Sequence, residues 1–164
     1  MRHYTRIGNI YEANVGELHK RFFQFIGRDV SDMNSDVIRI FNHLYRKSDT
    51  PPVDVIILDS VDCYMHTSVH AGVLQEKWKL YGRTRNVGDT DICFRDSNDY
   101  GFFPKQRIIS RNWTVWKMNK EREFVGPLPS KYHSAYIGSV YSPDSVVYRI
   151  ENQRYLSLYY PDYE

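Results

Sequence analysis

Short segments rich in aromatic and β-branched residues recur along this chain and limit the folds that it can adopt. The sequence contains 14 Tyr, 8 Phe and 3 Trp, many of them in runs such as residues 21–26 and 155–160. These side chains suit the pleated, half-buried surface of a sheet. The sequence therefore predicts a mostly β fold: a small, partly open β-barrel or a strongly bent antiparallel sheet, with at most one or two short helices.

Turn signals divide these segments into many short predicted strands. They lie at residues 9–13, 20–27, 53–58, 74–83, 91–95, 108–118, 123–126, 135–141, 145–150 and 154–160. Residues 108–118 and 123–126 are expected to form a hairpin. No repeat, linker or low-complexity tract divides the chain, so we expect one domain over residues 1–164.

Residues 35–46 leave two alternatives open. Behind a possible cap at Ser35, Val37, Ile40 and Phe41 begin a helical stripe. The stiff β-branched side chains of residues 37–41 favour a strand instead, because they lose freedom in a helix.

Charge and cysteine content exclude several classes of protein. The formal net charge is only +2, which argues against a nucleic-acid binder. No apolar run approaches the roughly 20 residues of a membrane span, and the amino terminus lacks a signal stretch, so a cytoplasmic protein without a membrane partner is expected. Cys63 and Cys93 have no metal-ligand spacing and are expected to be reduced, buried thiols. No cofactor is expected.

Two polar clusters are weak metal candidates. His66 and His70 have the spacing of zinc ligands on a helix, but Thr67 stands where a metalloprotease has Glu, and on a strand the imidazoles would lie about 13 Å apart. A second cluster offers oxygen ligands without the order of a calcium loop and is read as turns. Its members are Asp89, Asp91, Asp96, Asn98 and Asp99.

The three tryptophans have different expected positions. Trp78 alternates with Leu74 and Leu80, and all three are expected to face the core. Trp113 and Trp116 are three residues apart and cannot both face inward on a regular strand, so one is expected to be exposed or at a bulge.

The opposite face of residues 74–83 is the predicted binding surface. Tyr and Arg dominate protein hot spots, and a regular strand would display its polar side chains together. The predicted binding residues are Lys77, Lys79, Tyr81, Arg83 and Arg85. The other interpretation is a solvated face whose charges prevent edge-to-edge aggregation.

Two segments resemble a known family. Residues 7–13, Ile-Gly-Asn-Ile-Tyr-Glu-Ala, and residues 36–41, Asp-Val-Ile-Arg-Ile-Phe, look like the opening of the Imm26-type immunity proteins of bacterial polymorphic toxin systems. The resemblance implies a mostly β domain that protects the producing cell by binding a toxin encoded beside it. It implies no particular site residues.

The expected function is therefore non-catalytic binding of a protein, with toxin neutralisation as its concrete form. The alternative is a small enzyme with a site in residues 59–71 and 84–105, where the strand pattern is weakest. The sequence specifies neither the partner nor the oligomeric state.

Overall fold

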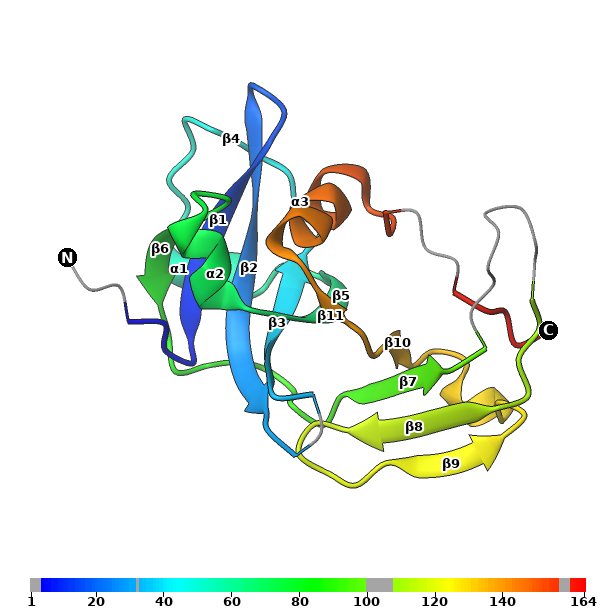
Figure 1. The fold of residues 1–164 in the computed structure, drawn as a ribbon. Helices are drawn as coiled ribbons and strands as arrows, with labels where there is room; N and C mark the ends of the chain where they lie inside the picture. The colour runs from blue at the N-terminus through cyan, green and yellow to red at the C-terminus, as the bar shows by residue number, and fades with distance from the viewer. Residues whose placement is uncertain (1–3, 32, 100–107, 157–159) are drawn as a thin grey trace.

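The fold consists mainly of strands arranged in two sheets (Figure 1). The structure is a computed structural model and describes residues 4–31, 33–99, 108–156 and 160–164. Neither sheet closes into a barrel, and the described residues include three short α-helices. The predicted mostly β class is confirmed, in its bent-sheet form.

The larger sheet has seven strands, in the order β11-β5-β3-β2-β1-β6, with β4 paired to one end of β2. All pairs are antiparallel except β11 with β5. The strands are β1 (Asn9–Val15), β2 (His19–Asp29), β3 (Ser35–Phe41), β4 (Tyr45–Arg46), β5 (Val61–Thr67), β6 (Lys79–Arg83) and β11 (Val140–Tyr141). The strand alternative for residues 35–46 is thus confirmed over β3.

The smaller sheet has four strands, in the order β10-β7-β8-β9. They are β7 (Cys93–Ser97), β8 (Trp113–Lys117), β9 (Glu123–Gly126) and β10 (Tyr136–Ile137). The predicted hairpin is confirmed as β8–β9, with β8 shorter than expected. A 3₁₀ turn, η1 (Ser130–Tyr132), follows it.

Helices cover one face of the larger sheet (Figure 1). They are α2 (Val69–Leu74) and α3 (Pro143–Asn152). Val69, Val146 and Ile150 are fully buried in the core between these helices and the sheet. The strands contribute to the same core Tyr11, Phe23, Phe25, Ile38, Ile40 and Met65.

The opposite face of the larger sheet carries two apolar clusters. At one end α1 (Val53–Ile56) places Ile56 against Phe22. At the other end the smaller sheet packs Phe94 against Ile26. The smaller sheet therefore covers only part of this face.

Buried polar groups lie on the same face. The Arg39 guanidinium donates from Nε to Gln24 Oε1 at 2.9 Å, and Gln24 Nε2 donates to the carbonyl of Asn86 at 3.1 Å. A Cβ on Gly88 would lie 2.1 Å from Arg39 Nη1, so the loop after β6 needs glycine where it crosses this arginine. This network holds the loop against the sheet.

Two predicted strands are helices. Residues 53–58 begin with a single helical turn, because the fixed φ of Pro52 leads into hydrogen bonds from the Ile56 and Ile57 amides. Residues 145–150 belong to α3, which Ser142 caps by accepting from the Ser145 amide at 3.2 Å. With proline at the first helical position, the residues between the predicted strands 135–141 and 145–150 start a helix instead of forming a turn.

Three further predicted strands differ from the structure. Residues 74–83 form a strand only from residue 79, because Leu74 ends α2. Residues 135–141 form β10 and β11, which pair with different sheets, so this segment crosses from the smaller sheet to the larger one. Gly138 makes the crossing possible, because a Cβ there would lie 2.0 Å from the Trp116 ring. Residues 154–156 are not in a strand, and residues 157–159 lie outside the described residues.

Trp113 and Trp116 are both buried, at 0% and 3% exposed. The expectation that one of them is exposed is wrong, because both faces of β8 are covered. Trp113 packs with Leu128, and Trp116 packs with Phe94. The alternative of a bulge fits the structure, since the pairing of β8 with β9 shifts between Trp113 and Thr114.

A buried carboxylate joins the two sheets. Asp29 Oδ2, at the end of β2, accepts hydrogen bonds from Trp116 Nε1 of β8 at 3.1 Å and from His66 Nε2 of β5 at 3.0 Å. Asp29 Oδ1 accepts from the Asn119 amide, in the turn after β8, at 3.1 Å and from the Ser31 hydroxyl at 3.3 Å. We call these five residues the Asp29 cluster.

Asp29 and His66 are fully buried. Burial lowers the pKa of His66, although the hydrogen bond with Asp29 opposes the shift. Burial acts to raise the pKa of Asp29, but the hydrogen bonds from His66, Asn119 and Trp116 outweigh it, so the pKa lies below its usual value. Near neutral pH a neutral His66 therefore donates to an ionised Asp29. Within the described part of the chain, His66 Nδ1 has no hydrogen-bond partner.

We predict that the free energy of unfolding of His66→Gln decreases less on acidification than that of the wild type. A histidine whose pKa is lowered by folding contributes stability that is complete above about pH 6.5, its unfolded value, and is lost as the pH falls towards the folded value. One such group can change the free energy of unfolding by at most about 1.4 kcal/mol per pH unit. Gln can still donate to Asp29 but does not titrate.

Urea denaturation between pH 7.5 and 5.5 measures this effect. The matched control is His70→Gln, because His70 is exposed on α2, and it should keep the wild-type pH dependence. Identical slopes for the wild type and His66→Gln would contradict the prediction.

Candidate functional site

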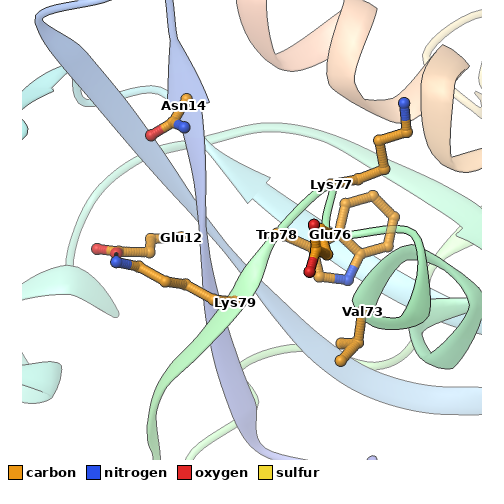
Figure 2. A pocket seen from close by; sticks show the side chains of 7 residues that line it. All are labelled: Glu12, Asn14, Val73, Glu76, Lys77, Trp78 and Lys79. Carbon is orange, nitrogen blue, oxygen red and sulfur yellow. Dashed lines mark ion pairs between the residues drawn. The ribbon is translucent and has the colours of Figure 1, made fainter.

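An open pocket of about 430 Å³ lies at the edge of the larger sheet, where the chain leading into β6 separates from β1. Figure 2 shows Glu12 and Lys79 on one side of this edge and Val73 and Trp78 on the other. The remaining lining residues are Asn14, Glu76 and Lys77. We call it the edge pocket.

The connection from α2 to β6 shapes the edge pocket. Ser68 caps α2 by accepting from the Ala71 amide, and the chain reverses through Glu76, whose φ of 56° is in the left-handed region. This reversal lays Trp78 on Gly72, where a Cβ would lie 1.9 Å from the indole ring. The indole Nε1 donates to the Val69 carbonyl at 3.1 Å, so Trp78 is fixed in place.

Glu12 is the most constrained charged group of the pocket. Its side chain is only 10% exposed and is bound by two lysines from neighbouring strands. Lys20 Nζ of β2 lies 2.9 Å from Oε2, and Lys79 Nζ of β6 lies 2.7 Å from Oε1. The lysines differ in environment, because the Lys20 side chain is 7% exposed and that of Lys79 is 79% exposed.

The two lysines keep Glu12 ionised. Burial acts to raise the pKa of Glu12, but the hydrogen bonds from Lys79 and Lys20 outweigh it and hold the pKa below its usual value. The same contact raises the pKa of Lys79. A charged, largely desolvated carboxylate thus lies beside the pocket.

The five predicted binding residues do not form one surface. Lys77 and Lys79 both line the edge pocket, although Lys77 reaches towards α3 and pairs with Asp144 (Figure 2). Tyr81 is only half-buried, yet its ring packs on Phe22 with centroids 4.7 Å apart. Its hydroxyl donates to the carbonyl of Pro51 at 2.7 Å.

A bulge separates Arg83 from the other predicted residues. Lys79 pairs with Glu12 and Arg83 pairs with Asn9, with a shift in register between Ile10 and Tyr11 of β1. Glu12 and Asn9 are three apart on a strand and point to opposite faces, and so do their partners. The expected regular alternation is therefore wrong here.

The remaining expectations for this segment have mixed outcomes. Arg85 is exposed in the loop after β6. Trp78 is buried as predicted, but Leu74 and Leu80 are not core residues, since they are 70% and 40% exposed. Leu74 ends α2, and Leu80 lies on the outermost strand of the sheet, so few elements remain to cover them.

Sequence reasoning missed Glu12 and Asn14 as pocket residues, and Lys20 as the buried partner of Glu12. A signal for the pair Glu12 and Lys20 existed, because the predicted strands 9–13 and 20–27 are consecutive and a short connection makes residues 12 and 20 close neighbours on adjacent strands. The observed register pairs Glu12 with Phe22 and Asn14 with Lys20, which leaves Glu12 and Lys20 as diagonal neighbours on one face.

A second pocket of about 360 Å³ joins the two regions proposed for an enzyme site. Tyr64 comes from residues 59–71, and Asp89, Asp91 and Cys93 come from residues 84–105; positions 100–105 lie outside the described residues. Burial raises the pKa of the Cys93 thiol, which disfavours the thiolate that a nucleophilic cysteine needs.

The candidate metal residues lie in different environments or accept hydrogen bonds from other residues. His66 is buried in the Asp29 cluster, whereas His70 is exposed. Asp89 accepts from the Asp91 amide at 2.8 Å, and Asp99 accepts from the Ser110 hydroxyl at 2.7 Å. Over the described ranges, no group of three or more His, Cys, Asp or Glu could hold a metal ion.

Comparison with protein-family models, with curated proteins and with solved structures gives no match. In the described part of the chain, none of the helices combines the length and the apolar character needed to cross a membrane.

We predict that the two lysines on Glu12 contribute unequally to stability. Lys20→Met should lower the free energy of unfolding by about 2 kcal/mol, because it leaves a largely buried carboxylate with a single exposed partner. Lys79→Met should lower it by less than about 1 kcal/mol, as is usual for an exposed ion pair. Urea denaturation at pH 7 measures both values, and equal losses would show that this difference in burial has no energetic consequence.

Proposed function

We propose that this chain is a non-catalytic protein-binding domain that neutralises a cognate bacterial toxin in the cytoplasm by binding it. The observation that carries the proposal is the composition of the surface around the edge pocket. Exposed leucines lie beside a concave site with charged residues, among them Lys77, Lys79 and Glu76. Apolar contacts next to a polar rim are typical of protein interfaces.

Leu74 and Leu80 are the apolar part of this surface. Their sequence neighbours Val73 and Lys79 line the pocket, so both leucines lie close to it. Exposed single leucines are common in proteins, but here they accompany a pocket that can receive an anchoring side chain. Hot spots form where such a side chain is desolvated in a pocket.

The resemblance to the Imm26-type immunity proteins supports a toxin as the partner. The first segment that carries it, residues 7–13, includes most of β1 and contains Glu12. The second segment, residues 36–41, lies within β3, on the other side of β2. The resemblance thus covers strands of the larger sheet and one residue of the candidate site.

A small enzyme is the second candidate function. It is favoured by one observation, the convergence of Tyr64, Asp89, Asp91 and Cys93 on the second pocket. The raised pKa of Cys93 argues against thiol chemistry there. An adjacent toxin gene would favour the binding function, and a metabolic operon would favour the enzyme.

We predict that Leu74→Asp weakens binding of the toxin encoded beside this chain by more than about 1 kcal/mol, as expected for a hot-spot side chain. Leu74 is 70% exposed, so thermal stability should change little. Phe124→Asp is the matched control, because Phe124 is also exposed but lies on β9 of the smaller sheet.

Isothermal titration calorimetry with the purified toxin measures both variants. Equal affinities of the wild type and Leu74→Asp would exclude the surface around the edge pocket. An equal loss in both variants would point to a general effect of added negative charge.

A further inference from the structure

We propose that Glu12 is the acceptor for an arginine side chain of the protein partner, which takes the place of Lys79 on Oε1. This inference rests on the proposed function and names the chemistry by which the partner would be recognised. It assigns Lys79 the role of an exchangeable counter-ion and Lys20 the role of a permanent one.

The two oxygens of Glu12 have different partners. Oε2 faces Lys20, which is almost completely buried and also lies 5.5 Å from the centres of the Phe22 and Tyr81 rings. Leaving this position would cost Lys20 both its ion pair and its aromatic contacts. Oε1 faces Lys79, whose side chain is 79% exposed and can move into water without disturbing the core.

Replacing Lys79 by a partner cation keeps the charge balance of the site. Glu12 would remain between two positive groups, so the exchange leaves no buried charge without a partner. The released Lys79 regains its hydration and its side-chain freedom, and an ion pair with so exposed a partner contributes little to stability. The desolvation cost of Glu12 has already been met on folding, so it does not oppose binding.

The surroundings of Glu12 suit a guanidinium better than an ammonium. A guanidinium has five N–H donors in a plane, and Asn14, two residues from Glu12 on the same face of β1, offers a further oxygen acceptor in the edge pocket. The half-buried ring of Tyr81 lies near Glu12 on the same face of the sheet, since Lys20 contacts both. Planar guanidinium groups stack on such rings.

The opposite arrangement, a partner carboxylate bound by Lys77 and Lys79, is less favoured. Lys77 already pairs with Asp144 and Lys79 with Glu12. Binding an external carboxylate at both lysines would therefore compete with two existing ion pairs, and breaking the second of these would leave Glu12 with Lys20 alone.

The test uses the purified chain and Nα-acetyl-arginine methylamide as the probe. Affinity is measured by NMR titration of the Tyr81 backbone amide, in the wild type and in Lys79→Ala. We expect Lys79→Ala to bind the probe at least fivefold more tightly, because the competing ammonium is absent. The citrulline analogue, which has the same shape without the charge, should not bind.

Lys77→Ala is the matched control variant. It removes the same charge from the same pocket but frees Asp144, which is 70% exposed, instead of Glu12. We expect its affinity for the arginine probe to stay within twofold of the wild type. An equal gain in both variants would show that net charge, not Glu12, governs binding.

Three other results would overturn the inference: equal affinity of Lys79→Ala and the wild type, equal binding of the citrulline analogue, or tighter binding of Nα-acetyl-glutamate methylamide that Lys79→Ala abolishes. The last would establish the anion-binding arrangement. If the toxin binds in calorimetry but the arginine probe fails, only the assignment of Glu12 is wrong. If the probe behaves as expected but the toxin does not bind, the proposed function is wrong.

Discussion

The burial of one carboxylate, Asp29, determines how the two sheets are arranged. An ionised carboxylate without water is tolerated only if donors surround it, and Asp29 obtains an indole, an imidazole and a backbone amide from three different places in the fold. The apolar cluster between the sheets could accept small displacements, because hydrophobic contacts are not directional. The hydrogen bonds of the Asp29 cluster cannot, so they define one relative position of the two sheets.

The groups around Glu12 differ from those around Asp29. Asp29 serves the structure alone, whereas Glu12 has one partner at the surface. The donors around Asp29 belong to the interior or to the turns that follow β2 and β8, whereas Lys79, one of the two cations on Glu12, is 79% exposed. The charged group is pre-organised in both cases. At Glu12, unlike at Asp29, a cation of another molecule can replace an exposed side chain, Lys79, without opening the core.

The sequence predicted features governed by local pattern and failed where distant parts of the chain meet. The β class and the hairpin of β8 with β9 follow from residue pattern and turn chemistry, whereas Trp78 is buried as predicted but through the reversal after α2 and not through alternation with Leu74 and Leu80. Helix α3 was not predicted, because the β-branched residues of 145–150 favour a strand and Ser142 and Pro143 also suit a turn. The bulge that moves Arg83, and the contact between Asp29 and His66 across 37 residues, depend on packing that no local pattern reveals.

The segment that crosses between the sheets has a consequence for biosynthesis. β10 and β11 are adjacent in the chain, yet each adds a parallel strand to a different sheet. Parallel pairs between distant segments form slowly, because loop closure must precede their contacts. On the ribosome, both sheets therefore remain incomplete until residues 136–141 have emerged, and α3, which covers the apolar face of the larger one, emerges later still. Until then the nascent chain exposes aggregation-prone strand edges, a state from which chaperones protect growing polypeptides.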